Sequence, residues 1–147
     1  MAQRELTREE IEQLLRSQRI VRVAFSVDGR LYLLPLGYVW LDGALHLMTS
    51  AGQKTEMAAA NGRVAFQVDD SAEHGMTGWS SATGEGEWEI ITAKMEQMKI
   101  GAALVARFPE LLSWANRETI KKESSAALIF ARIKPLWMTG RTFLADE

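Results

Sequence analysis

The chain has 147 residues, of which 47% are hydrophobic and 24% are charged, and its net charge at pH 7 is −2. These values fit one soluble domain with a core of its own, and they give no sign of general nucleic-acid binding. The absence of cysteine excludes a disulfide framework, a thiolate metal site and a cysteine nucleophile. The polar N-terminus is no signal peptide and no apolar run could span a membrane, so we expect a cytoplasmic protein.

The first predicted elements are a capped helix and a strand. Thr7 can cap a helix that ends near Ser17, because Glu10 is placed as its capping-box partner. Ile20–Val27 is rich in β-branched and aromatic residues, which predicts a strand. Asp28-Gly29 then predicts a tight hairpin turn.

The second predicted strand, Leu31 to Trp40, contains a proline and a glycine. Pro35 has no backbone donor and Gly37 has no side chain, so this strand is expected at an edge of the sheet or with a bulge. A tight turn over Leu41–Ala44 leads into a third strand at Leu45–Thr49.

The stretch from His46 to Asn61 is the best candidate for a binding site from the residues alone. It passes from a strand through Ser50–Gln53 into a helix predicted over Lys54–Ala60. The free N–H groups at a helix start attract anions, Lys54 adds a positive charge, and Gly52 lets a ligand come close to the backbone. The competing interpretation is an ordinary connection with a solvated lysine.

The remaining elements complete a mostly β pattern. In chain order they are a strand at Arg63–Val68, a polar loop at Asp69–Gly78, a long strand at Trp79–Ile91, helices at Ala93–Arg107 and Glu110–Asn116, a charged loop at Glu118–Ser124, and strands at Ser125–Ile133 and Trp137–Phe143 on either side of Pro135. Six or seven short strands joined mostly by hairpins indicate an antiparallel sheet that curls or closes. The absence of βαβ alternation and of a GxGxxG motif argues against a doubly wound dinucleotide fold.

No catalytic residue and no metal site are assigned from the sequence. His46 is interpreted as a residue on a strand face, and His74 has no partner at metal-ligand spacing. The pair Ser80-Ser81 lacks the GxSxG frame of a serine hydrolase. The alternating glutamates of 85–89 are interpreted as a solvated strand face.

Taken in order, these segments resemble the pyridoxamine 5'-phosphate oxidase-like superfamily, the split-barrel FMN-binding proteins. The most specific part is the series T-S-x-G-x-K, a short helix, N-x-R-V-A-F and W-x-S-x-x-x-x-G. The resemblance implies a mainly β fold with flanking helices, an antiparallel split β-barrel that forms a single FMN-binding domain over residues 1–147. It also implies a homodimer with FMN at the subunit interface, and no nucleic-acid or membrane partner is expected.

The resemblance further implies ten cofactor-binding residues on four segments. Lys54 would bind the FMN phosphate, with Ser50 and Gln53 close by, and Met48 and Thr49 would lie along the flavin ring, largely through their backbone. Leu34, Pro35 and Leu36 would form the strand beneath the ring. Trp79 and Ser81 would lie near the cofactor, in such proteins often from the partner subunit.

The activity implied by the resemblance is that of an FMN-dependent oxidoreductase, which passes a hydride between a reduced nicotinamide and a small-molecule acceptor. FMN would then carry the chemistry, and no protein acid or base is obligatory. The alternative is a non-catalytic protein of the same fold that holds flavin, haem or the deazaflavin F420 as a carrier, sensor or store. Vitamin B6 oxidation is not expected, because the arginine-rich C-terminal end of true pyridoxamine phosphate oxidases has no counterpart here. Met48 replaces the histidine of some nitroimidazole-resistance relatives, so that activity is not expected either.

Overall fold

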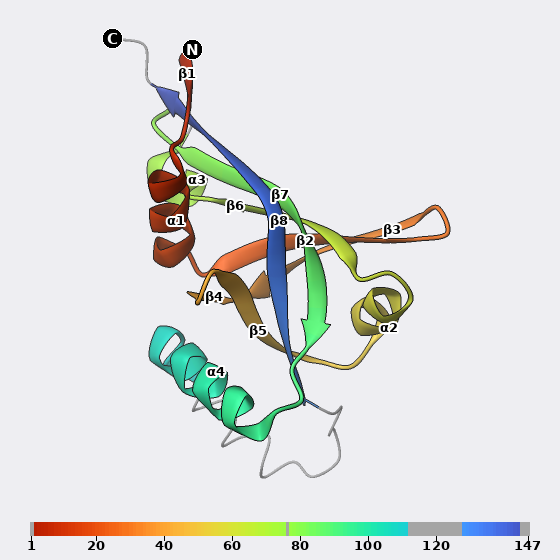
Figure 1. Cartoon of the computed structure of the whole chain (residues 1–147). Coiled ribbons are helices and arrows are strands. Elements are labelled where there is room, and N and C mark those ends of the chain that lie inside the picture. Colours follow the sequence, from red (N-terminus) through yellow and green to blue (C-terminus); the bar gives the residue numbers. More distant parts are fainter. Residues whose placement is uncertain (1, 76, 112–127, 145–147) are drawn as a thin grey trace.

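The computed structural model describes residues 2–75, 77–111 and 128–144 of the chain. Its elements, in chain order, are β1 (Ala2–Glu5), α1 (Arg8–Ser17), β2 (Ile20–Val27), β3 (Arg30–Gly37), β4 (Val39–Leu41), β5 (Ala44–Ser50), α2 (Gln53–Ala60), β6 (Arg63–Asp69), α3 (Ser71–His74), β7 (Ser80–Ile90), α4 (Lys94–Arg107) and β8 (Leu128–Leu144). The helices flank one curled sheet (Figure 1). Among these residues, no helix is both long and apolar enough to cross a membrane.

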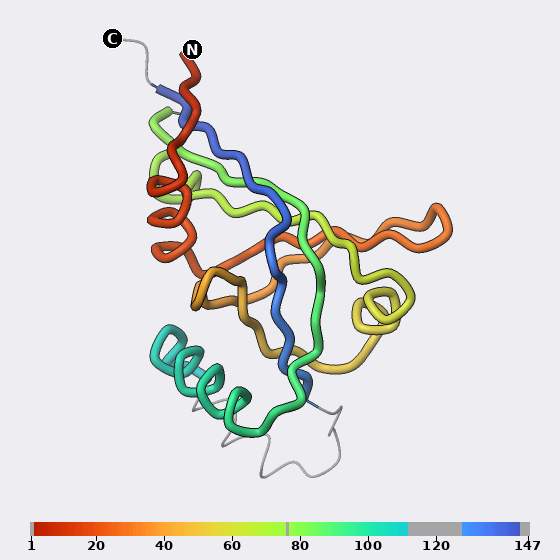
Figure 2. The backbone as a smooth tube through the Cα atoms, viewed as in Figure 1, coloured from red at the N-terminus to blue at the C-terminus, as the bar shows by residue number. Residues whose placement is uncertain are grey.

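The eight-stranded sheet has the order β3-β2-β6-β7-β8-β5-β4, with β1 added beside β8. All of its strand pairs are antiparallel. The two edge strands, β3 and β4, are separated in the chain by Tyr38 alone, so the sheet must curl until its edges meet there. Figure 2 shows this curl, and it also shows the β2–β3 hairpin projecting from it. The predicted fold class, a mainly β antiparallel split barrel with flanking helices, is confirmed.

Tyr38 divides the strand that was predicted as continuous from Leu31 to Trp40. Its backbone N–H donates to the Arg19 carbonyl at 3.0 Å, and its hydroxyl donates to the Leu15 carbonyl at 2.6 Å. The first bond continues the β2–β3 register one residue beyond Gly37, and the second ties the fully buried Tyr38 to α1. Pro35 lies on an edge strand, as expected, and the β2–β3 register runs through it without a bulge.

The last strand also differs from the prediction. Two strands were expected on either side of Pro135, whereas β8 runs unbroken from Leu128 to Leu144. Pro135 pairs with Gly86 and Trp137 pairs with Glu85, so one extra residue forms a bulge. A bulge leaves a residue outside the regular ladder, which accommodates a proline in a strand interior. The expected start of this strand at Ser125 lies outside the described residues.

Two short elements were not predicted, and others cannot be compared. β1 is wholly exposed and pairs with Arg141–Leu144, while α3 lies within the predicted polar loop. The helix predicted at 110–116 lies outside the described residues from 112 onward, and so does the whole of the loop predicted at 118–124.

The helix α1 closes one opening of the barrel. Its predicted capping box is confirmed, because the Glu10 N–H donates to Thr7 Oγ1 at 3.2 Å and the Thr7 N–H donates to the Glu10 carboxylate at 3.0 Å. Its buried side chains join a core that is lined mainly by valine, leucine and phenylalanine. This close packing holds the first part of the chain on the barrel.

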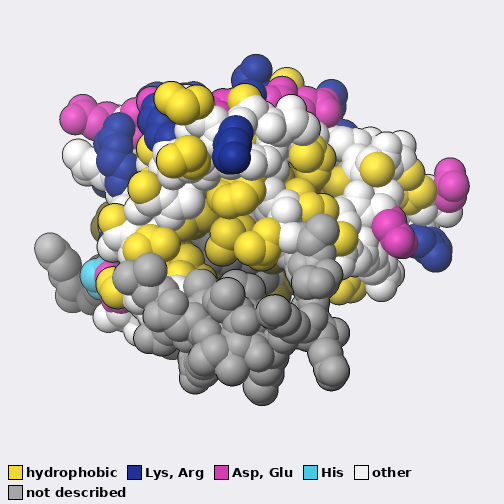
Figure 3. All heavy atoms as spheres, turned by 90° about the horizontal axis from the view of Figure 1, so that it is seen from below, with side chains coloured by type: hydrophobic (Ala, Val, Ile, Leu, Met, Phe, Trp, Pro, Cys, Tyr) yellow, Lys and Arg dark blue, Asp and Glu magenta, His cyan; other side chains and the backbone are white. Residues whose placement is uncertain are grey.

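The helix α4 covers the outside of the barrel at β5 and β4, below the sheet in Figure 1. Its Ile100 and Leu104 form a second apolar cluster that includes Met48 of β5. Because side chains alternate along a strand, Leu45 and Leu47 point into the barrel core, whereas His46 and Met48 point toward α4. Seen from below, hydrophobic side chains gather in the middle of this face (Figure 3).

Candidate functional site

The predicted strand–turn–helix is present between β5 and α2. β5 ends at Ser50 and α2 begins at Gln53. A Cβ added at Gly52 would have no heavy atom within 4 Å, so the space beside this turn is open. At the other end of α2, the Asn61 side-chain amide donates to the Ser26 carbonyl at 2.8 Å and ties the helix to β2. The turn is therefore held at a fixed place on the barrel.

The hydrogen bonds of the turn leave three N–H groups available. The Gly52 N–H donates to Thr55 Oγ1 at 2.9 Å, and this hydroxyl donates to the Gly52 carbonyl at 2.9 Å. The first intrahelical bond runs from the Glu56 N–H to the Gly52 carbonyl at 3.1 Å. The N–H groups of residues 53–55 precede that bond, so they have no helical acceptor. They form the positive end of α2.

Lys54 lies half-buried in this first turn of α2. In the described ranges, no carboxylate forms an ion pair with its ammonium group. Ser50 and Gln53 are exposed beside it. The turn thus gathers a cation, a hydroxyl, an amide and the N-terminus of a helix, and this set of donors suits an anion such as phosphate.

The backbone of β5 next to this turn is open along one edge. β8 pairs with Leu45–Ser50, but on the other side β4 pairs with Ala44–His46 alone. From Leu47 to Ser50, no strand in the described part of the chain occupies that second edge. Unpaired strand edges offer alternating donors and acceptors to a ligand. Because successive residues of a strand direct their backbone groups to alternate sides, one of the pair Met48 and Thr49 has its N–H and C=O on the side away from β8.

The other predicted strand lies beside this edge. Within the described part of the chain, β3 pairs only with β2. It contacts β5 and continues through Tyr38 into β4, the partner of β5. Leu34 and Leu36 pack on the barrel core, while Pro35 is exposed. The structure thus places the β3 segment and the β5 segment on neighbouring strands, with open edges in the region between them.

Trp79 and Ser81 do not lie near the β5–α2 turn or the open edges of β3 and β5. Trp79 stacks on Phe143 with ring centroids 4.0 Å apart, and Ser81 pairs with Arg141 on β8. Ser50 pairs with Leu128 at the other end of the same strand. The thirteen residue-to-residue steps from Leu128 to Arg141 correspond to about 40 Å along an extended strand. Eight of the ten predicted residues gather on β3, β5 and α2, and these two lie at the far end.

A cluster that sequence reasoning missed lies under the first half of α4. His46 of β5 lines a cavity of about 250 Å³ together with charged side chains from the β4–β5 turn, α4 and β8. The members come from three distant segments, 41–46, 96–100 and 132–134, and no spacing in the sequence connects them. Among the described residues, no group of three or more His, Asp or Glu is placed to hold a metal ion.

A sequence model of the pyridoxamine 5'-phosphate oxidase family matches residues 7–142. The chain belongs to this family. Among individual sequences, an uncharacterized protein of Rhizobium meliloti is 25% identical over 149 residues, which cover 98% of this chain and 97% of that one.

Solved structures with the same fold extend the comparison. An FAD-binding protein from Mesorhizobium loti is 29% identical and superposes with a TM-score of 0.78 over 96% of each chain. HutZ, the haem storage protein from Vibrio cholerae, is 12% identical and has a TM-score of 0.73 over 93% of this chain and 96% of HutZ. At that identity HutZ supports the fold alone.

Proposed function

We propose that this protein is a flavoprotein that binds FMN at the β5–α2 turn. The observation that carries the proposal is the donor set at this turn: three N–H groups without helical acceptors, the Lys54 ammonium and open space beside Gly52. A phosphate dianion at the N-terminus of a helix is stabilised by the helix dipole and by hydrogen bonds to charged groups. Similarity to an FAD-binding protein favours a flavin over other phosphorylated ligands.

In this proposal the flavin ring lies beside the open edges of β3 and β5. The backbone of Met48 and Thr49 would pair with the polar edge of the ring, and the Leu34–Leu36 strand would lie beneath it. The side chains of Leu34, Leu36 and Met48 already pack in apolar clusters, which leaves backbone groups as the polar contacts of this region. Backbone contacts orient a planar ring without any particular side chain.

The proposal includes a second copy of the chain. Trp79 and Ser81 lie about 40 Å along β8 from the turn, so they approach the bound flavin only as residues of the partner subunit. Leu31 and Leu33 of the edge strand β3 are 81% and 67% exposed, which suits burial in an interface. A homodimer with two FMN sites between its subunits accounts for both features.

The activity we propose is hydride transfer between a reduced nicotinamide and a small-molecule acceptor. When bound, FMN would supply the redox chemistry, and the chain's own residues would bind it, orient it and shape the space above one face of the ring. A non-catalytic binder of flavin, haem or F420 is the second candidate. It is favoured by the residues expected along the flavin ring, Leu34–Leu36 and Met48–Thr49, which carry no acidic or basic side chain.

The proposal is tested by equilibrating the purified protein separately with FMN, FAD, riboflavin, F420 and haemin, then removing unbound ligand and recording the absorption spectrum. We expect FMN to be retained more strongly than riboflavin, because only FMN carries the phosphate. The FMN complex is then mixed without oxygen with NADH or NADPH. Bleaching of the flavin band, followed by its return with an added acceptor, supports the oxidoreductase. A flavin that stays oxidised supports the non-catalytic binder.

A further inference from the structure

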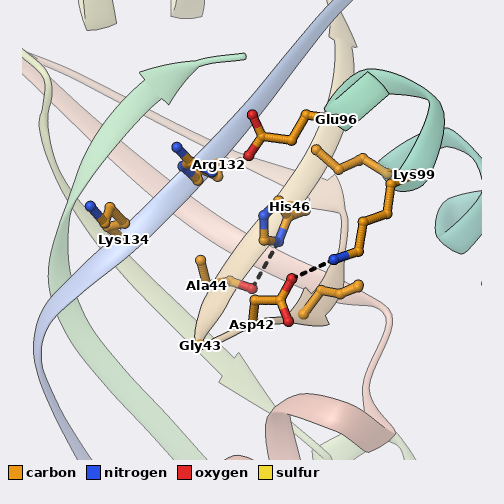
Figure 4. Close-up of a pocket in the computed structure, with 10 residues that line it drawn as sticks. Asp42, Gly43, Ala44, His46, Glu96, Lys99, Arg132 and Lys134 are labelled. Atoms are coloured by element: carbon orange, nitrogen blue, oxygen red, sulfur yellow. Dashed lines mark hydrogen bonds and ion pairs between the residues drawn. The ribbon is translucent and has the colours of Figure 1, made fainter. Parts of the chain in front are cut away.

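The cavity at His46 lies outside the barrel, between the β4–β5 turn, the first half of α4 and β8 (Figure 4). Its volume is about 250 Å³, and none of the ten residues expected to bind a flavin lines it. This volume is below the range of about 300–1,000 Å³ that is usual for sites of drug-sized ligands. The cavity suits a small metabolite.

His46 forms the buried wall of this cavity and is 5% exposed. Its Nδ1 lies 3.2 Å from the Ala44 carbonyl oxygen. A carbonyl oxygen can only accept, so Nδ1 carries the proton and Nε2 has a free lone pair. Burial lowers the pKa of His46, which keeps the ring neutral at pH 7. Within the described ranges, no group donates a hydrogen bond to Nε2.

The charges around His46 are largely paired with each other. Lys99 contacts the Asp42 carboxylate at 2.8 Å, and Arg132 contacts the carboxylates of Glu96 and Glu89, each at 2.7 Å. The Arg132 bonds use Nε and Nη1, so Nη2 is without a carboxylate among the described residues. Arg132 is the direct cross-strand partner of His46.

Two cations, Arg132 and Lys134, line the cavity from β8, whereas the Glu89 carboxylate that contacts both of them does not line it. The described carboxylate nearest to Lys134, that of Glu89, lies 3.7 Å away. The lining residues comprise three cations, Arg132, Lys134 and Lys99, and two carboxylates, Asp42 and Glu96. A ligand complementary to these groups donates a hydrogen bond to His46 Nε2 and presents a negative group toward Arg132 and Lys134.

We propose that this cavity binds a small hydroxycarboxylate, whose hydroxyl group donates to His46 Nε2 and whose carboxylate lies beside Arg132 and Lys134. A simple carboxylate lacks the donor for His46, and a neutral polyol lacks the charge for β8. The site is separate from the proposed flavin site, so the two proposals can fail independently.

The test uses nuclear magnetic resonance of the histidine rings in the full chain at pH 7.5. The chain has two histidines, and exposed His74 serves as an internal reference. We expect the ring of His46 to show the Nδ1–H tautomer. Addition of lactate should shift the His46 signals alone, and propionate should bind about threefold to tenfold more weakly, the range of one neutral hydrogen bond. Glycerol should bind more weakly than lactate too.

A variant separates the contribution of the carboxylate. Lys134→Met should weaken lactate binding severalfold. The side chain of Lys134 is exposed, so this substitution does not disturb the core. Lys94→Met removes an equal charge from α4 at a position that does not line the cavity, so lactate binding should be unchanged. An Nε2–H tautomer for His46, unchanged His46 signals in about 50 mM lactate, equal binding of propionate, or equal effects of the two lysine variants would overturn the proposal.

Discussion

Ser50 and Ser81 lie beside opposite ends of β8, where Ser50 pairs with Leu128 and Ser81 pairs with Arg141. The two serines belong to the two halves of the predicted cofactor site, and the strand holds these halves about 40 Å apart along its length. The sheet is continuous between them, so no local rearrangement joins the halves within one subunit. In the proposed dimer, a shared site is built by two copies of the chain.

The first prediction concerns this shared site. A heterodimer made from one Lys54→Ala subunit and one Trp79→Leu subunit should bind about one FMN with nearly wild-type affinity. One of its sites then contains an intact Lys54 and the partner's intact Trp79, while the other site lacks both. Titration of purified heterodimer, carrying a different tag on each subunit, measures this stoichiometry. If the heterodimer binds as weakly as each homodimeric variant, the two residues do not meet across an interface.

The second prediction concerns the phosphate. Lys54→Ala should weaken FMN binding by about 1.5–3 kcal/mol, because a charged hydrogen bond to the phosphate is lost. Riboflavin has no phosphate, so its affinity should not change. Fluorescence titrations with both ligands measure the difference, and Lys94→Ala on α4 is the matched control. Equal losses for FMN and riboflavin would remove Lys54 from the phosphate site.

The third prediction concerns the residue that joins the two edges of the sheet. Tyr38→Phe should lower the free energy of unfolding by about 1–3 kcal/mol, because the Leu15 carbonyl then loses its buried donor. Urea unfolding measures this value. Tyr32→Phe is the control, because the hydroxyl of Tyr32 has no hydrogen-bond partner among the described residues. A Tyr38→Phe protein as stable as the control would show that this bond does not hold the barrel edges together.

The fourth prediction concerns stability at mildly acidic pH. Burial lowers the pKa of His46 below 6.5, its ordinary value. Below about pH 6.5 the unfolded chain binds this proton before the folded protein does, so the stability that depends on His46 decreases as pH falls through the folded-state pKa. Asp42 and Glu96 favour the charged ring and Arg132 opposes it, but burial is the largest effect.

This fourth prediction is measured as the change in urea midpoint between pH 7.5 and pH 5. The wild-type protein should lose more stability over this range than His46→Gln, whose side chain does not titrate. His74→Asn should behave as the wild type, because that ring is exposed. A His46→Gln variant with the same pH dependence as the wild type would contradict the assignment.

The local elements could be predicted because their signals lie within a few neighbouring residues. Asp28-Gly29 and Asp42-Gly43 were recognised as hairpin turns, and all four residues have the positive φ that such turns require. The capping box of α1 and the β5–α2 turn were recognised in the same way. The break at Tyr38 was missed, because this residue is buried against α1 through its hydrogen bond to Leu15, which belongs to another segment of the chain.

The continuity of β8 could not be predicted for a related reason. Pro135 argues against a strand interior unless a partner strand allows a bulge, and that partner, Gly86, lies far away in sequence. β1 has no apolar alternation and forms only because β8 extends beyond the barrel. The cavity at His46 was missed because its charges meet through the cross-strand pairing of His46 with Arg132 and the packing of α4.

Flavin binding by the whole chain is the central property of the proposed function. The decisive measurement is the absorption spectrum of the purified protein after equilibration with FMN and dialysis, repeated with Lys54→Ala. Flavin bands that survive dialysis in the wild-type protein and are lost in the variant are the predicted result. A protein that retains no FMN, or a variant that retains as much as the wild type, would contradict the proposed site.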